Sequence, residues 1–341
     1  MNNKSTNNEN YQIMTMSLVI LAIIMLSFAL YYSRAILIPF VFAVFIRFLI
    51  APIVDFQMKK LKIYRFVAVP IAILLLFLFF FITIPPIYAS FIDFLNRSNE
   101  YQEKLNLLIN PLIILFQDKF DLEYNSLTLQ NLFSKYLSYE IVSNIFSQTT
   151  NFLKTTSVIF IILIFLLIGE NDKRKTRTWY EIDRTIKKYI NTKFLTSLAT
   201  SILFGLTYWF FKLDLALIFA FLTFFLSFIP VFGGVIAILL PLPIALIQYD
   251  SYTTLILILI IPLCINFIIG NFIETKILGS ALSLNPVTII LALIFWGMLW
   301  GFIGIFLAVP LTAVIKILFD QFETTKNFAR VLQGNIHHRD I

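Results

Sequence analysis

Few polar residues of this 341-residue chain stand inside its long apolar runs, and these residues are the ones that could do chemistry. Glu274 lies between Asn271 and Lys276, in the one polar island from Tyr252 to Lys316 that carries both signs of charge. A carboxylate inside a membrane segment could exchange a proton or bind a cation. If the island lies at the water interface instead, its charges only mark the end of a loop.

A second candidate is Arg47, which Phe45, Ile46 and Phe48 flank in an early apolar run. An ionised side chain at membrane depth is costly unless it faces a cavity or a partner. Arg47 is also only one or two helical turns from Asp55, so its long side chain could reach the headgroups. The sequence leaves both interpretations open.

A third candidate is made of backbone rather than side chains. The run from Phe228 to Val235 holds Pro230, Gly233 and Gly234 inside an apolar stretch. Such a break frees carbonyl and amide groups that can bind an ion or a polar solute. The same residues could instead form a tight loop with no ligand.

The composition decides which elements must position these residues. Hydrophobic residues make up 59% of the chain and charged residues 13%, and apolar runs of about 20 residues recur. This pattern predicts an all-α, polytopic integral membrane protein and excludes a soluble enzyme. No catalytic or nucleotide-binding motif is present, and a lone Cys264 excludes a cysteine metal cluster. We expect no enzymatic activity, metal, cofactor or nucleic-acid partner.

We expect about eight spans, together with broken or re-entrant segments. The stretches 215–249 and 286–319 are each too long for one upright span and short for two, so each is a tight pair or a re-entrant hairpin. The predicted organisation is a disordered cytoplasmic tail (1–12), N-terminal transmembrane helices (13–86), a small helical extracytoplasmic domain (87–156), a C-terminal transmembrane transport core (157–319) and a cytoplasmic tail (320–341).

Loop charges give the orientation, because short cytoplasmic loops are rich in Lys and Arg. Four basic residues lie between Asp55 and Arg65, counting Arg65 itself, and eight basic against four acidic residues lie from Glu170 to Lys193. The segment from Ile87 to Thr156 has five basic and seven acidic residues. Both termini are therefore predicted to be cytoplasmic.

Three motifs of the second half share the pattern of one known family. They are Ile229-Pro-Val-Phe-Gly-Gly234 with Pro241 after it; Asn271-Phe-Ile-Glu-Thr-Lys-Ile-Leu-Gly279 followed by Leu284-Asn285-Pro286; and Gly301-Phe-Ile-Gly304 with Ala308-Val-Pro310-Leu-Thr-Ala-Val314. The chain resembles the AI-2E family of permeases in these motifs and in its layout. Pro286, Gly301, Gly304 and Pro310 are the framework residues of the resemblance.

The resemblance implies a secondary transporter or facilitator of the bacterial cytoplasmic membrane that exports a small hydrophilic signal or metabolite such as autoinducer-2. The substrate pathway would include Arg47, Pro230, Gly233, Gly234, Asn271, Glu274 and Lys276. The alternative is a sodium (lithium)/proton antiporter using Glu274, and a third is a scaffold that binds partners through residues 87–156. The expected partners are the lipid bilayer, a small polar solute, a proton or sodium ion for coupling, and further copies of the chain.

Overall fold

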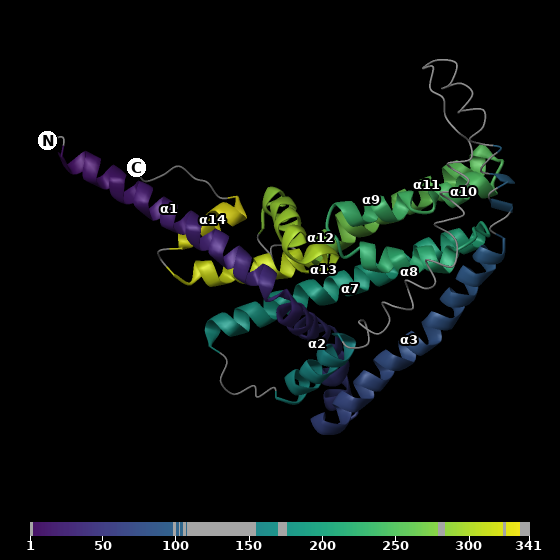
Figure 1. Cartoon of the computed structure of the whole chain (residues 1–341). Coiled ribbons are helices and arrows are strands. Elements are labelled where there is room, and N and C mark those ends of the chain that lie inside the picture. The colour runs from purple at the N-terminus through teal and green to yellow at the C-terminus, as the bar shows by residue number, and fades with distance from the viewer. Residues whose placement is uncertain are drawn as a thin grey trace, which may run out of the picture.

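The structure is a computed structural model, which describes residues 3–97, 100–101, 103–104, 107, 155–169, 176–278, 284–322 and 325–334. Every regular element in these ranges is a helix (Figure 1). Within this part of the chain, four helical stretches are long and apolar enough to cross a membrane: Arg34–Lys60, Arg65–Asn96, Tyr252–Leu278 and Pro286–Asp320. Shorter apolar helices cover Ser17–Tyr32, Thr155–Ile168, Ala216–Leu226 and Phe232–Gln248. The predicted all-α membrane architecture is confirmed.

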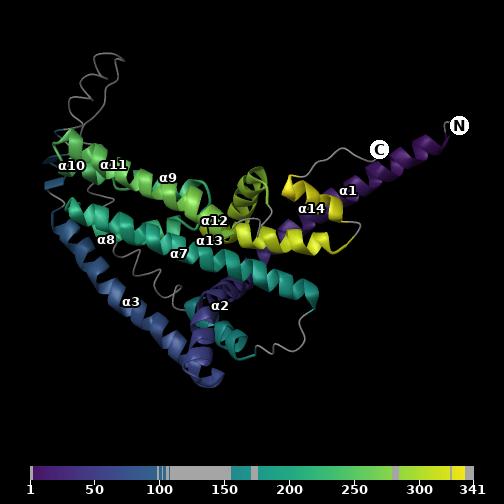
Figure 2. The same ribbon diagram turned by 180° about the vertical axis from the view of Figure 1, so that it is seen from behind.

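The first helix starts earlier than the sequence suggested. Helix α1 (Asn3–Tyr32) includes residues 3–12, which we expected to be a disordered tail. These residues are polar but include neither Pro nor Gly, so no side chain among them ends the helix that the following apolar residues form. α1 points away from the other helices at its N-terminal end and meets α2 (Arg34–Lys60) after Ser33 (Figures 1 and 2).

Helix α3 (Arg65–Asn96) runs through the boundary that we placed after residue 86. Pro85 and Pro86 each remove one backbone hydrogen bond, yet the helix continues for ten residues beyond Pro86. An apolar surrounding favours this outcome, because ending the helix would expose further backbone groups. Most of the helical domain predicted over 87–156 lies outside the described residues.

The long helix α7 (Arg177–Phe210) is the centre of the fold. It packs against α2, against α8 (Ala216–Leu226), and against the two C-terminal helical stretches α11 (Tyr252–Phe267) and α13 (Pro286–Asp320). In both ribbon views α7, α8, α9 and α11 lie side by side, while α3 diverges from them (Figures 1 and 2). Gly205 permits the close contact of α7 with α8, since a Cβ there would lie 2.8 Å from the Ala220 Cβ.

The stretch 215–249, which is too long for one span and short for two, folds as a helical hairpin that we call the first hairpin. Its arms are α8 on one side and, on the other, α9 (Phe232–Leu239) extended by α10 (Leu242–Gln248). Phe219 of α8 and Ala237 of α9 share a buried cluster with Phe204 and Tyr208 of α7. The residues between the arms, 227–231, form its tip.

The stretch 286–319, which has the same intermediate length, is also folded back on itself. Helix α13 breaks at Gly301, whose φ of 64° and ψ of −142° are not helical, and we call its two arms, 286–300 and 302–320, the second hairpin. The Trp296 indole N–H donates to the Thr312 hydroxyl at 3.2 Å, although 16 residues of straight helix would separate them by about 24 Å. Gly304 lies directly against the Trp296 carbonyl.

The tips of the two hairpins meet beside α2. The Phe228 ring lies 4.7 Å from the Phe306 ring and 5.8 Å from the Phe45 ring, measured between ring centroids. Phe42 and Phe224 extend this group, which we call the aromatic cluster. The hairpins open toward opposite ends of the molecule, because α10 and α14 (Lys326–Gln333), which follows α13, lie at opposite ends (Figure 1).

Helix α14 gives structure to part of the predicted cytoplasmic tail 320–341. It folds back on the open end of the second hairpin, where the Asn285 N–H donates to the Leu332 carbonyl at 3.0 Å. The Gln333 amide donates to Asp320 at 3.3 Å. These bonds join the two arms of the second hairpin to the helix that follows them.

Candidate functional site

A buried ion pair lies at the tip of the first hairpin. The Lys193 ammonium of α7 is 2.7 Å from Glu274 Oε1 and donates to the main-chain carbonyl of Ser227 at 3.0 Å. The side chains of Lys193 and Glu274 are only 8% and 18% exposed. Three separate elements therefore meet at one ammonium group.

The local structure explains why a cation sits here. Ser227 follows the last residue of α8, and the final carbonyls of a helix have no partner within it. They also carry the negative end of the helix dipole, so a lysine near them is favoured. Glu274 ends the π-helix η2 (Ile268–Glu274), a rare element that is frequent at functional sites.

Buried polar side chains continue along α7 on both sides of Lys193. The Thr196 hydroxyl is 3.4 Å from Glu274 Oε2 and 3.0 Å from the Thr192 carbonyl, and Thr200 donates to the Thr196 carbonyl at 2.8 Å. Among the residues that the structure describes, the hydroxyls of Tyr189 and Ser197 are buried without a hydrogen bond. The face of α7 toward the core thus carries hydroxyls without a hydrogen-bond partner in the described part of the chain, which is uncommon for buried polar groups.

The tip itself is held in a strained turn. Val231 has φ 66° and ψ −54°, and the Phe232 N–H donates to the Pro230 carbonyl at 2.7 Å. This is a γ-turn of positive φ, which is rare, and a β-branched residue is poorly suited to it. Such strain persists only where the surroundings enforce it and is concentrated at functional sites.

The two glycines after the tip are required by close approach rather than by their own backbone angles. A Cβ on Gly233 would lie 1.8 Å from the Leu226 carbonyl oxygen, so the arms of the first hairpin could not close. A Cβ on Gly234 would lie 2.3 Å from the side-chain oxygen of Asn266 on α11. Asn266, which the sequence analysis did not select, therefore borders the tip.

The structure brings together some of the predicted pathway residues and separates others. Pro230 lies in the tip, Gly233 and Gly234 follow it at the start of α9, and Glu274 reaches the tip through Lys193. Asn271 and Lys276 lie on the same helical stretch as Glu274, but their side chains are exposed. Arg47 is half-buried on α2, with its guanidinium 5.4 Å from the centre of the Phe48 ring.

The framework residues of the second hairpin have structural positions. Pro286 begins α13, where Asn285 caps the helix by accepting from the Val287 N–H at 3.0 Å. Gly301 makes the turn, Gly304 allows the arms to touch, and Pro310 is buried in the second arm.

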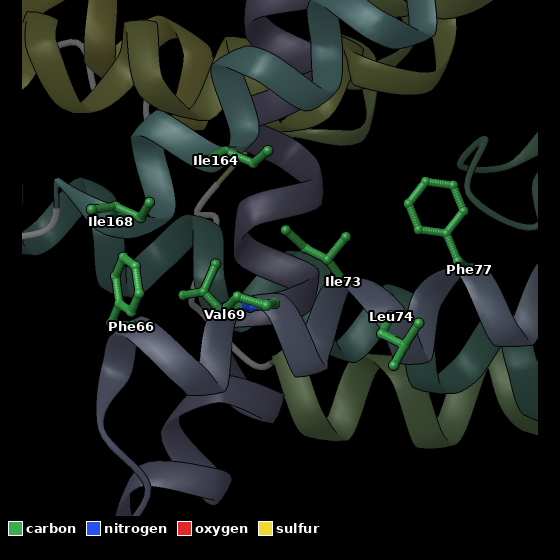
Figure 3. A pocket seen from close by; sticks show the side chains of 8 residues that line it. Phe66, Val69, Ile73, Leu74, Phe77, Ile164 and Ile168 are labelled. Atoms are coloured by element: carbon green, nitrogen blue, oxygen red, sulfur yellow. The ribbon is translucent and has the colours of Figure 1, made fainter.

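A pocket of about 420 Å³ lies elsewhere, between α3 and the helix Thr155–Ile168 (Figure 3). All of its lining side chains are apolar: Phe66, Val69, Pro70, Ile73, Leu74, Phe77, Ile164 and Ile168. It offers no polar group to a hydrophilic solute, so it does not compete with the hairpin tip as a solute site.

Comparison with known proteins agrees with the motifs. The sequence model of the family described as "AI-2E family transporter" matches residues 18–324 of this chain. The chain belongs to the AI-2E transporter family. It is 25% identical to "AI-2 transport protein TqsA" of Escherichia coli K12 over 314 residues, which cover 88% of this chain and 90% of that protein.

Two further relatives, from Borreliella burgdorferi and Haemophilus influenzae, both carry the name "Putative transport protein". Each is 25% identical to this chain. The matches cover 89% of the chain and 86% of the Borreliella burgdorferi protein, and 92% of the chain and 94% of the Haemophilus influenzae protein. The chain is therefore a multi-pass membrane protein of a bacterial transporter family.

Proposed function

We propose that this chain is a permease that exports a small hydrophilic signal or metabolite, of the kind to which autoinducer-2 belongs, past the tips of its two hairpins. The observation that carries the proposal is the buried pair of Lys193 and Glu274, bonded to the broken backbone at Ser227. A polar solute crossing a membrane needs donors and acceptors at depth, and broken helices supply them. The family and the relative named as an AI-2 transport protein support the same function.

Helix lengths support a place near the middle of the membrane for this site. At 1.5 Å per residue, the 11 residues of α8 cover about 16 Å, roughly half of a hydrocarbon core about 30 Å thick. If α8 enters at one surface, its tip ends near the midplane. The second hairpin enters from the opposite end and meets the first there, which is how transporters form a central site.

The aromatic cluster would close the pathway in the observed conformation. Phe45 and Phe228 belong to the same buried core as Phe306, and the three rings pack with centroids 4.7–5.8 Å apart. A hydrophilic solute cannot pass between packed aromatic rings without separating them. We infer that transport requires the tip of the first hairpin to move away from α2 and from the second hairpin.

The polar contacts at the two ends fit the orientation expected from loop charges. At one end, Lys187 pairs with Asp55 at 2.9 Å, and Lys188 donates to the Leu278 carbonyl at 3.0 Å. At the other, Arg97 lies 3.6 Å from Asp214. The first end would be cytoplasmic, with both termini, and the second would face outside.

Flux through purified protein in sealed liposomes tests the proposal. Labelled autoinducer-2 would be followed across the membrane while a pH dye records proton movement on addition of sodium or lithium. We expect solute movement, its loss in Glu274→Gln, and retention in Gly270→Ala, where a new Cβ meets no atom within 4 Å. The same vesicles without protein give the background.

Two outcomes would overturn the proposal. A sodium- or lithium-driven proton signal without solute movement would favour the antiporter. Silence in both assays, from protein that elutes as a single folded species, would favour a scaffold that binds partners.

A further inference from the structure

The oxygen atoms around the Lys193 ammonium form a set that is typical of a cation site. One is a carboxylate oxygen, Glu274 Oε1 at 2.7 Å, and another is a main-chain carbonyl at the end of a broken helix, Ser227 O at 3.0 Å. The Ser227 hydroxyl is also buried and makes no hydrogen bond within the described part of the chain. In secondary transporters, the C-terminal ends of half-helices and unwound carbonyls coordinate sodium ions or receive protons.

The position that such an ion would take is filled here by the side chain of the protein itself. Lys193 is 6% exposed and stands one turn from Thr196, whose hydroxyl approaches the other oxygen of Glu274 at 3.4 Å. The ammonium neutralises the carboxylate and satisfies the carbonyl at once, which are the two tasks of a bound monovalent cation. Because it is covalently attached to α7, it cannot be exchanged between the two sides of the membrane.

We propose that the Lys193 ammonium is a tethered cation that replaces an exchangeable coupling ion at the hairpin tip, so this chain needs neither sodium nor lithium. The role of this cation in transport rests on the proposed function, but which cation occupies the site can be measured without transport. It also separates the two transport hypotheses, since an antiporter would need the Glu274 carboxylate to be open to solution cations.

A second ion pair in the chain shows what an ordinary structural pair looks like. Lys187 and Asp55 are 2.9 Å apart, close to the 2.7 Å of Lys193 and Glu274, but their side chains are 36% and 48% exposed. Removing that lysine would leave a carboxylate that water can solvate. Removing Lys193 would instead leave a carboxylate and a helix-end carbonyl facing each other across an enclosed space, and these oxygens would favour binding of a cation.

The test measures the melting temperature of the full chain in lipid nanodiscs, without any transport. Sodium, lithium, potassium and choline chlorides would be compared at equal ionic strength. We expect the wild type to melt at the same temperature, within about 1 °C, in all four salts, because no site responds to them. We expect Lys193→Ala to be stabilised by a small alkali cation over choline, with a saturable rise of about 2 °C in melting temperature at ten times the Kd.

Two matched variants make the test specific. The double variant Lys193→Ala with Glu274→Gln lacks both charges and should lose the cation response, and Lys187→Ala should behave as the wild type. A saturable sodium or lithium response of the wild type overturns the proposal, even if no Lys193 variant folds. A folded Lys193→Ala that melts alike in all four salts overturns it as well. Failure of the flux assay with these melting results intact would count against the proposed function alone.

Discussion

Replacing Glu274 by Gln leaves the Lys193 ammonium enclosed without its counter-charge, and this change should be among the most destabilising single substitutions in the transport core. The two side chains are 8% and 18% exposed and 2.7 Å apart. Breaking a buried pair by removing one partner costs about 3–5 kcal/mol. Because Glu274 is partly exposed, we expect a loss of about 3 kcal/mol in the free energy of unfolding.

A double-mutant cycle separates the pair from its surroundings. Lys193→Met should cost about as much as Glu274→Gln, because it leaves the carboxylate unpaired. The double variant should cost less than the sum of the two, with a coupling energy of about 2 kcal/mol. The exposed pair of Lys187 and Asp55 is the control, and its cycle should give about 0–1 kcal/mol.

The assay is reversible unfolding in mixed micelles of dodecyl maltoside and SDS, followed by the far-ultraviolet circular dichroism of this helical chain. Each cycle needs four proteins measured in one detergent series. Additive free energies at the buried pair, within about 0.5 kcal/mol, would contradict a strong interaction between Lys193 and Glu274. So would equal coupling energies at the buried and the exposed pair.

Three other predictions concern the hairpin tip and the end opposite α14. Gly233→Ala should lower the free energy of unfolding by about 1–3 kcal/mol, because its Cβ would overlap a main-chain oxygen. In the same unfolding assay Gly270→Ala should be neutral or stabilising by up to about 1 kcal/mol, and equal effects of the two variants would contradict the hairpin geometry. Val231→Gly should keep or raise stability by about 1 kcal/mol, because relief of a positive-φ strain of about 1–3 kcal/mol exceeds the entropic cost of glycine, and a clear loss would contradict that strain. Burial, and secondarily the charge of Asp214, raise the pKa of Tyr249 to about 12. The contribution of this phenol to stability is therefore complete below pH 10 and is lost as the pH rises toward 12. Ultraviolet titration of the wild type against Tyr249→Phe should show this late midpoint, and a midpoint near pH 10 would contradict it.

The hairpins could be anticipated from the sequence, because proline and glycine residues and the length of each apolar stretch indicate a break. Pro230, Gly233 and Gly234 disfavour one continuous helix through the first stretch, and the length of each stretch fits neither one span nor two. Gly301 turned out to be the turn of the second hairpin, with a positive φ that suits glycine. The sequence could not say that the two tips would meet, because this depends on how distant helices pack.

Glu274 was a candidate from the sequence, whereas Lys193, its ion-pair partner in the structure, was not. We placed Lys193 at the end of a basic cytoplasmic loop, because Lys187 and Lys188 precede it and the apolar run begins after it. The structure instead continues one helix, α7, through the whole region and buries Lys193. A signal was present in the three- and four-residue spacing of Tyr189, Lys193, Thr196 and Thr200, which puts polar groups on one helical face.

The length of the first helix was also not readable from composition. Polarity and low complexity suggested a tail over residues 1–12, whereas the structure includes residues 3–12 in α1. Similarly, Pro85 and Pro86 suggested an end of the third span near residue 86, yet α3 continues to Asn96. In both cases an apolar helix extends through residues that do not themselves favour a helix.

Flux through protein whose hairpin tip can be clamped and released tests whether the solute passes between the two hairpins. In a background in which the exposed Cys264 is replaced by Ser, Phe45→Cys and Phe228→Cys would be joined by a short bis-methanethiosulfonate reagent, since these two rings lie 5.8 Å apart. We predict that the clamped protein carries no autoinducer-2 across the liposome membrane, and that flux returns when a reductant opens the link. The reagent should not change the flux through either single cysteine variant. Undiminished flux through fully cross-linked protein would contradict passage between the hairpins.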